Sequence, residues 1–488
     1  MQFTLFICLI SYSLLLFLVM WLTSRKADNQ TYFIGNRRSP WFVVAYGMVG
    51  ASLSGVTFLS VPGDVYNTQF TYFGIVLGYI VGYIVIAKIL LPLYYRLNLT
   101  SIYTYLEQRF GNASYKTGSF FFILSRLLGS ALRMYLVIYV LQEFVFCHWN
   151  IPIAVTASFF VLIILLYTFK GGIKTIVWTD TLQTTFFLAA LVFTIIFIPK
   201  EMDLSFGQIF NEMQIKGYTK IFNVEWREHN FFIKQIISGA FITITMTGLD
   251  QDMMQKNLTC KNIKEAQRNM FTFTGVLVFV NALFLVMGGM LIIYSINNGI
   301  DLTSIKTDRI FSTVAFNYLP SIAAIVFVIG LISAGYSSAD GTLTALTTVL
   351  CVDFLGLEKM KKTEKEKINI RRIMHILMGI LFLLVILVFS HFHNDALIRI
   401  IFQVASYTYG PLLGLYTFGL FTKRKLKADR LVPFFAILSP LICLLLNKFS
   451  AQLLCGYIFG FELLLVNGLV MFSFLWINSR KDSSLQSE

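Results

Sequence analysis

Long apolar runs separated by short polar segments dominate the sequence. Each run has roughly 20 residues or more, which is enough for one helix to cross a bilayer. The runs cover about residues 4–22, 41–61, 69–95, 117–145, 150–169, 177–199, 231–250, 269–296, 318–353, 373–391, 395–421, 431–447 and 451–477. Runs 117–145 and 318–353 exceed one perpendicular crossing, so we expect them to tilt or to extend past the bilayer. The pattern predicts an all-α polytopic membrane protein with about 13 transmembrane helices.

Composition supports this prediction, because 57% of the residues are hydrophobic and only 13% are charged. The net charge of +14 could suggest binding to nucleic acid, but the basic residues are concentrated in alternate loops. These residues are Arg25, Lys26, Arg37 and Arg38; Lys256, Lys261, Lys264 and Arg268; Lys359, Lys361, Lys362, Lys365, Lys367, Arg371 and Arg372; and Lys423, Arg424, Lys425, Lys427 and Arg430. Loops 62–68, 146–149 and 392–394 carry almost none. We therefore expect a lipid bilayer, and no nucleic acid, as the partner of this surface.

The same distribution of charge predicts the orientation in the membrane. Positively charged loops stay in the cytoplasm, which places the N-terminus outside and the C-terminus inside a cell (inner) membrane that the chain crosses many times. The first span lacks a basic segment before it and is followed by Arg25 and Lys26, so we do not read it as a secretory signal peptide. The cysteines show no close spacing, and neither a zinc site nor a disulfide framework is indicated; they are Cys8, Cys147, Cys260, Cys351, Cys443 and Cys455.

The second span is a poor helix for its length. Residues 47–63 contain glycines at 47, 50 and 55 and hydroxyl side chains at 52, 54, 57 and 60. A broken membrane helix exposes backbone carbonyls, which is tolerated where protein or a water-filled cavity surrounds them. Such carbonyls beside small hydroxyls suit a sodium ion, so the stretch is a candidate for half of a transport site. The alternative is that the small residues only allow a neighbouring helix to pack closely.

Two arginines occupy the fourth span. Arg126 and Arg133 are seven residues apart and share a helix face. Arg133 lies near the middle of its run, where a charge is expensive and points to a polar cavity or to a buried partner. A purely structural pairing with a carbonyl or carboxylate is the alternative.

The ninth span is unusually polar over residues 333–342. Ser337, Asp340 and Gly341 lie on one helix face, and the hydroxyls with the carboxylate form an oxygen-rich strip suited to a hard cation. Packing of small residues could explain the serines but not Asp340. In the sixth span, Asp180 is expected near the cytoplasmic end, at a depth similar to that of Asp340, with solvation at the membrane interface as the alternative.

The seventh span ends in an acid–amide cluster, residues 247–258. We expect this cluster where the span meets the cytoplasm, where Asp250 could cap the helix. Contact of Asp250 or Gln251 with a substrate is left open. Among the other segments, 200–230 reads as an external loop with short helical pieces, 358–370 as a solvated helix or linker, and the tail 479–488 as disordered.

Several of these motifs, taken in order, resemble the sodium/solute symporter family. They are Gly171-Gly172 with Trp178-Thr179-Asp180 and Gln183; Asp250-Gln251 with Gln255-Lys256-Asn257-Leu258, Lys261-Asn262 and Ala266; and Ser337-Ser338 followed by Asp353-Phe354. They lie within about residues 35–425. The resemblance implies a leucine-transporter-type fold, in which five helices are repeated with inverted topology. The expected parts are an extra helix and loop (1–40), the first repeat (41–200), an extracellular loop (201–230), the second repeat (231–425) and two further helices with a tail (426–488).

The resemblance also implies a sodium site. Its ligands would be the backbone carbonyls of Gly50, Leu53 and Ala334 and the hydroxyls of Ser337 and Ser338. Some members hold a second sodium ion between the acid equivalent to Asp180 and hydroxyls just beyond the serine pair. This sequence has Asp340 and Gly341 in place of those hydroxyls. A second cation site would therefore be formed by two carboxylates, Asp180 and Asp340, or these residues could bind a proton instead.

For the substrate, the resemblance to sialic acid carriers assigns Ser52, Ser54, Thr57 and Arg133, with Phe73 nearby. No amide stands between Phe73 and Leu77, where a sialic acid carrier would supply one. Because arginine in a buried pocket recognises carboxylates, we favour sodium-coupled import of a small organic anion, such as sialic acid or a monocarboxylate, by alternating access. A neutral sugar or polyol is the alternative, and a membrane enzyme or a sensor fits less well. His391 and His393, at an external loop, are read as interfacial residues. The sequence does not specify the substrate, the number of sodium ions or the oligomeric state.

Overall fold

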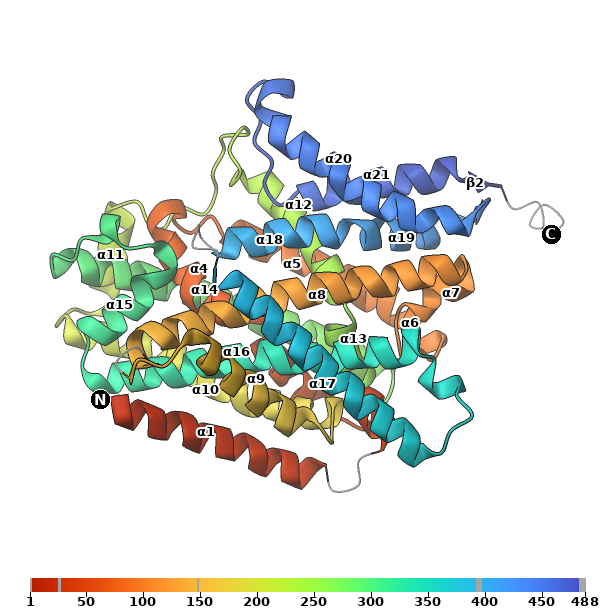
Figure 1. Cartoon of the computed structure of the whole chain (residues 1–488). Helices are drawn as coiled ribbons and strands as arrows, with labels where there is room; N and C mark the ends of the chain where they lie inside the picture. The colour runs from red at the N-terminus through yellow and green to blue at the C-terminus, as the bar shows by residue number, and fades with distance from the viewer. Residues whose placement is uncertain (1, 25–27, 147–148, 392–396, 482–488) are drawn as a thin grey trace.

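Helices aligned along one direction make up almost all of the structure. The computed structural model describes residues 2–24, 28–146, 149–391 and 397–481. Arg25, Lys26, Cys147, His393 and residues 482–488 of the tail therefore lie outside the described residues. Figure 1 shows the helices side by side, with the start of α1 at one end of the molecule and strand β2 at the other. A chain that crosses a membrane an odd number of times has its two ends on opposite sides of that membrane, and this arrangement agrees with it.

The number of candidate spans agrees with the apolar pattern. Within the described residues, eight helices are long and apolar enough to cross a bilayer, and two bent helix pairs raise the number to ten. Three shorter apolar helices, α9, α19 and α21, occupy three further predicted runs. The helices outside the two predicted repeats are α1 (Gln2–Thr23), α2 (Asn29–Ile34), α11 (Phe206–Ile215), α20 (Val432–Leu453) and α21 (Leu463–Ile477). Strands β1 (Lys425–Leu426) and β2 (Ser479–Arg480) pair antiparallel beside the C-terminus.

The predicted first repeat begins with a bent helix pair. Its helices are α3 (Trp41–Ser52), α4 (Gly55–Thr68), α5 (Phe73–Val85), α6 (Leu91–Arg96), α7 (Thr104–Arg109), α8 (Asn112–Leu141), α9 (Ile153–Thr168) and α10 (Ile173–Glu201). A π-helical turn, Ile86–Leu90, joins α5 to α6 within one span. Helix α4 ends at Thr68, beyond the predicted end of the span at residue 61.

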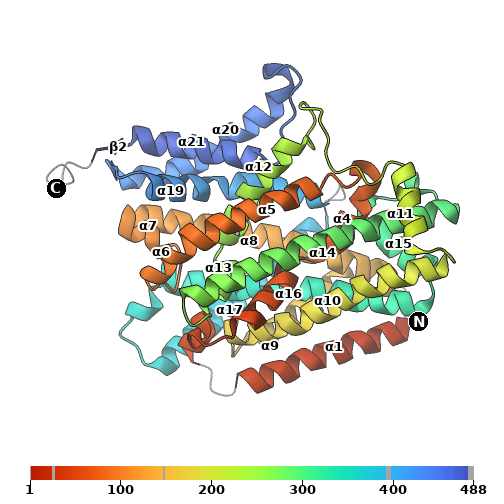
Figure 2. The ribbon, with the colours of Figure 1, turned by 180° about the vertical axis from the view of Figure 1, so that it is seen from behind.

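The predicted second repeat also begins with a bent pair. Its helices are α12 (Phe232–Thr243), α13 (Gln251–Leu258), α14 (Ile263–Asn297), α15 (Ile310–Asn317), α16 (Ser321–Val349), α17 (Glu364–Phe389), α18 (Leu397–Thr408) and α19 (Gly410–Phe421). The two bent pairs run in opposite directions (Figure 2). Just before α3, Ser39 donates its backbone N–H to Thr259, the residue that follows α13, at 3.1 Å. The start of one pair thus lies beside the end of the other, as inverted repeats require.

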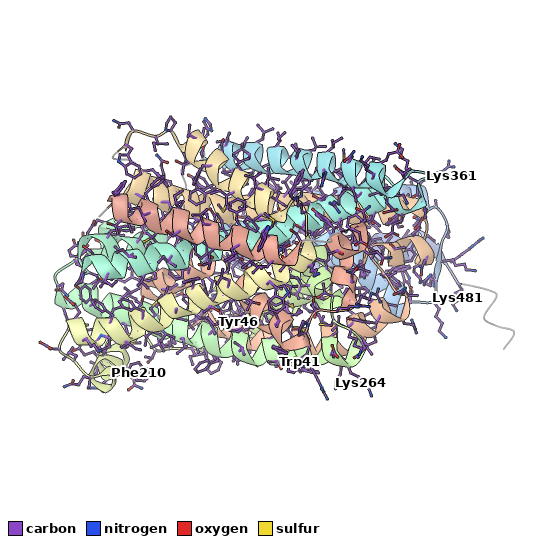
Figure 3. All side chains as sticks on the ribbon, turned by 90° about the horizontal axis from the view of Figure 1, so that it is seen from below. Trp41, Tyr46, Phe210, Lys264, Lys361 and Lys481 are labelled. Carbon is purple, nitrogen blue, oxygen red and sulfur yellow. The ribbon has the colours of Figure 1, made fainter. Side chains whose placement is uncertain are left out.

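Three lysines of the charged segments lie toward the same end of the molecule. Lys264, Lys361 and Lys481 lie at the end opposite Phe210 of helix α11 (Figure 3). This grouping agrees with the alternation of charge along the loops. Lys256, which we counted among the loop residues, is an exception, because it is buried within α13. Arg371 is also buried, with its guanidinium 4.2 Å from the centre of the Tyr32 ring.

At the end where the N-terminus lies, α4 and α12 are held by different partners. Lys234 of α12 donates hydrogen bonds to the carbonyls of Glu228, at 3.0 Å, and of Ile458, at 3.3 Å, in the loop before α21. Its ammonium also lies 3.6 Å from the centre of the Tyr457 ring. Phe58 of α4 instead packs its ring at centroid distances of 5.2 to 6.1 Å against four phenylalanines of α10, α14, α15 and α16: Phe187, Phe284, Phe311 and Phe327.

Helices α5 and α12 meet through glycine. A Cβ atom on Gly239 would overlap the carbonyl oxygen of Ile75, so Gly239→Ala must push the helices apart. We expect this substitution to cost about 1–3 kcal/mol of stability, seen as a lower melting temperature of the purified protein. Gly275→Ala in α14 is the matched control, because nothing lies within 4 Å of its added Cβ. Equal melting temperatures for the two variants would contradict this packing.

Candidate functional site

The first break lies where the sequence predicted it. Helix α3 ends at Ser52, α4 begins at Gly55, and the two axes differ by 56°. The last backbone bond of α3 runs from Leu53 N–H to the Val49 carbonyl. The carbonyls that follow Val49 therefore lack partners within this helix. The prediction of freed carbonyls beside small hydroxyls in this span is confirmed.

A second break, which the sequence analysis did not predict, interrupts the seventh span. Residues 244–248 form a π-helical turn, and the chain then bends by 64° into α13. Asp250 accepts a hydrogen bond from Met253 N–H, so it does cap a helix, but that helix is α13 inside the protein. The placement of this cluster where the span meets the cytoplasm was wrong, because every residue of α13 is buried. Gly248 followed by an N-capping aspartate was the signal for this break.

A cavity of about 100 Å³ lies between the two breaks. Both broken helices contribute to its wall, together with α5, α8, α14 and α18. Its lining residues are Ala51, Ser52, Leu53, Ser54, Val56, Thr57, Tyr72, Tyr79, Tyr83, Arg126, Arg133, Ile242, Thr243, Met246, Thr247, Met253, Leu277, Asn281 and Ile401. The cavity is therefore enclosed by elements that lie far apart in the sequence.

Four of the five predicted substrate residues line this cavity, namely Ser52, Ser54, Thr57 and Arg133. The fifth, Phe73, does not belong to its wall. Tyr72, Tyr79 and Tyr83 line the cavity at helical spacing. Phe73 directly follows Tyr72, and successive residues of a helix point in different directions, so its side chain does not share this face.

The sequence analysis missed these tyrosines and Asn281. Asn281 of α14 is buried, and its amide nitrogen donates to the Leu277 carbonyl at 2.8 Å. Tyr72 and Tyr79 are joined by a hydrogen bond of 3.1 Å between their hydroxyls. A tyrosine repeated at helical spacing in an apolar span was an available signal, but it equally fits ordinary packing. Asp250 and Gln251 are absent from the wall, so neither reaches the cavity.

The five predicted sodium ligands lie on two helices that contact one another. Gly50 and Leu53 belong to the end of α3, and Ala334, Ser337 and Ser338 belong to α16, which packs against α3. All five residues are buried. Carbonyl and hydroxyl oxygens are the donor atoms that hard cations prefer, so the residues present fit a sodium ion.

Each carboxylate oxygen of Asp180 of α10 has one close polar neighbour. Ser337 donates its hydroxyl to one carboxylate oxygen of Asp180 at 2.9 Å, and the Lys256 ammonium lies 2.8 Å from the other. Only 1% of Asp180 is exposed, which excludes solvation at the membrane interface. Asp340 points elsewhere and accepts a hydrogen bond from the Tyr167 hydroxyl at 2.8 Å. No lysine or arginine nitrogen of the described residues lies within 4 Å of the Asp340 carboxylate.

The two arginines of α8 differ in their partners. Arg126 forms ion pairs with Asp252 and, at 3.6 Å, with Asp250, and the Tyr409 hydroxyl donates to Asp250 at 2.6 Å. Asp252 also lies 3.5 Å from Lys256, so the charged chain continues to Asp180. Arg133 lines the cavity wall, and no carboxylate among the described residues lies within ion-pair distance of it. Structural pairing therefore accounts for Arg126 but not for Arg133.

Comparison with known proteins agrees with this architecture. The chain is 25% identical over 407 residues to a sodium/sialic acid symporter (NanT) of Aliivibrio fischeri, with 82% of this chain and 79% of that protein covered. It is also 25% identical over 407 residues to the mouse sodium-coupled monocarboxylate transporter 1, covering 81% of this chain and 64% of that one. The chain thus spans under two thirds of the mouse protein.

Solved structures share the fold. A substrate-bound, outward-open Na⁺-coupled sialic acid symporter superposes with a TM-score of 0.82 at 21% identity, covering 98% of this chain and 99% of that chain. Mhp1, a nucleobase-cation-symport-1 family transporter, gives 0.59 at 14% identity, covering 92% and 94%. These likenesses establish the leucine-transporter-type fold. The profile of the Sodium:solute symporter family matches residues 32–456. The chain therefore belongs to the sodium:solute symporter family and is a sodium-coupled carrier of a solute, not an enzyme.

Proposed function

We propose that this protein imports a small organic anion together with sodium by alternating access. The observation that carries the proposal is Arg133, whose guanidinium faces the cavity between the two breaks with no carboxylate of the described residues paired to it. A buried guanidinium binds a carboxylate through charge-assisted and often bidentate hydrogen bonds. The solute would supply the anion that the protein itself does not.

The small size of the cavity supports a compact solute. Its volume of about 100 Å³ is below the roughly 300–1,000 Å³ typical of pockets for drug-sized ligands. A monocarboxylate suits this space better than a bulky sugar acid does. The hydroxyls of Ser52, Ser54 and Thr57 would hydrogen-bond the remaining polar atoms of the solute.

The proposed sodium site explains how the ion would assist solute binding. Carbonyls at the end of α3 and hydroxyls on α16 would share one cation, which ties the broken helix to its neighbour. Leu53 is both a predicted sodium ligand and part of the cavity wall, so ordering this turn also shapes the solute site. A ligand that binds one conformation more tightly shifts the population toward it, and sodium would thereby favour the state that binds solute.

We expect Arg133→Ala to weaken sodium-driven uptake of the solute strongly. Purified protein in liposomes is first screened with monocarboxylates, sialic acids, sugars and amino acids under an imposed sodium gradient. For the carboxylate identified, loss of a buried charged hydrogen bond is expected to weaken half-saturation roughly ten- to hundredfold or more. The measurement is uptake against solute concentration for both proteins.

Arg309→Ala is the matched control, because Arg309 lies outside the cavity and pairs with Glu143. It should leave the half-saturating solute concentration unchanged. Unaltered uptake by Arg133→Ala would refute the anion assignment, and accumulation of a neutral sugar or polyol would favour that alternative. Accumulation without any ion gradient would contradict secondary transport altogether.

A further inference from the structure

We infer that the Lys256 ammonium is a built-in replacement for a second sodium ion, so that this carrier binds one sodium ion per cycle. The inference rests on the proposed sodium site between α3 and α16 and deepens it by fixing the number of ions. The family resemblance would place a second ion at Asp180, with hydroxyls of α16 as further ligands. In this chain the residues around Asp180 do not fit such an ion.

The first reason is that both oxygens of Asp180 are engaged. The Lys256 ammonium lies 2.8 Å from one oxygen, and the Ser337 hydroxyl donates to the other at 2.9 Å. Lys256 and Asp180 are each only 1% exposed, so water does not compete for this pair. The positive charge that a metal ion would supply to Asp180 is therefore supplied by a side chain that cannot leave the protein.

The second reason is space on α16. A Cβ atom at position 341 would overlap the Asp252 carboxylate and would lie 2.9 Å from the Lys256 ammonium. Any hydroxyl-bearing residue at this position would collide with the ion pair. Gly341 thus makes room for the Asp252 carboxylate and for the Lys256 ammonium beside it, so the absence of a hydroxyl at this position and the presence of the ion pair go together.

The third reason is the direction of Asp340. Its carboxylate accepts from Tyr167 at 2.8 Å and lies 3.4 Å from the Gln183 amide nitrogen, on the side of α9 and α10. It therefore does not replace the lost hydroxyls as a ligand beside Asp180. The two-carboxylate site predicted from the sequence is divided into an ion pair, Asp180–Lys256, and a separate hydrogen-bonded acid.

Electrostatics then disfavours another cation beside Asp180. Two positive charges a few ångströms apart repel strongly in a poorly solvated interior. Asp252 lies 3.5 Å from the same ammonium, which holds Lys256 in place from its other side. The ammonium is tethered to α13, whereas a sodium ion would enter and leave with each cycle.

One consequence concerns charge movement. With one sodium ion per cycle, a monovalent anion would cross without net charge, and its accumulation would not respond to membrane voltage. With two ions, each cycle would move one positive charge, and accumulation would then respond to membrane voltage.

Equilibrium binding of radioactive sodium to the purified full-length protein tests the inference without knowledge of the solute. We expect one ion per chain and no cooperativity. The double variant Lys256→Ala/Gly341→Ser removes the ammonium, supplies a hydroxyl and leaves Asp180 without its cation, and we expect it to bind two ions per chain. Lys264→Ala, which removes an exposed lysine, is the matched control and should bind one.

Each outcome has a distinct meaning. Two ions bound by the unaltered protein would overturn the inference while leaving the proposed sodium site intact. No sodium binding by the unaltered protein would instead refute the proposed sodium site itself. Should the double variant fail to fold, Lys256→Arg keeps a cation at Asp180 and must still bind a single ion, and two ions bound by it would overturn the inference.

Discussion

Asp252→Asn is expected to cost about 3–5 kcal/mol of stability, because it removes one partner from a buried ionic network. Asp252 lies between two cations: Arg126 forms an ion pair with it on one side, and Lys256 lies 3.5 Å away on the other. All three side chains are at most 5% exposed. Without the carboxylate charge, two buried positive groups would face each other across a neutral amide.

The expected cost is a large share of a typical folding free energy of roughly 5–15 kcal/mol. It should appear as a markedly lower melting temperature in detergent and a reduced yield of monodisperse protein. Asp203→Asn is the matched control, because it makes the same chemical change at an exposed position outside the spans. If Asp252→Asn melted at the same temperature as the control Asp203→Asn, the network would add little to stability.

Ser337→Ala is expected to raise the sodium concentration for half-maximal uptake by roughly ten- to hundredfold, since it removes one hydrogen-bonding group from a charged site. The Ser337 hydroxyl is proposed as a sodium ligand, and in the structure it also donates to Asp180. Its loss therefore removes a ligand and releases the carboxylate beside the site. The measurement is uptake against sodium concentration in liposomes at saturating solute.

Ser333→Ala provides the comparison for this variant. Ser333 is a buried serine of the same helix, but its hydroxyl donates to the Ile329 carbonyl of its own helix at 2.7 Å. We expect its sodium dependence to match that of the unaltered protein. If Ser337→Ala also kept the original dependence, the ion would have to bind elsewhere.

The span pattern and the first break were predictable because each depends on local properties of the chain. Apolar length determines which segments can cross a bilayer. In residues 47–61, three glycines and four hydroxyls weaken one helix in one place, and the structure has its break between Ser52 and Gly55. The depth of Arg133 likewise pointed to a polar cavity, and its side chain lines one.

The second break had a local signal, Gly248 before an N-capping aspartate, but the ionic network had none. Residues 250–258 look like the end of a span followed by a loop, because polarity alone does not distinguish solvent from a buried ion pair. The burial of Lys256 depends on Asp180 and on Gly341, which lie 76 and 85 positions away in the chain. Such a match between distant residues has no signal within a sequence window.

The different attachments of α4 and α12 have a consequence for how the solute path opens. Phe58 packs α4 against phenylalanines of α10, α14, α15 and α16, whereas Lys234 hydrogen-bonds α12 to the loop before α21. Under the proposed alternating access, an opening between these half-helices would be bordered by two helices with different partners. It would widen if one of them moved relative to the other. A movement of the loop before α21 would then be transmitted to α12 through Lys234.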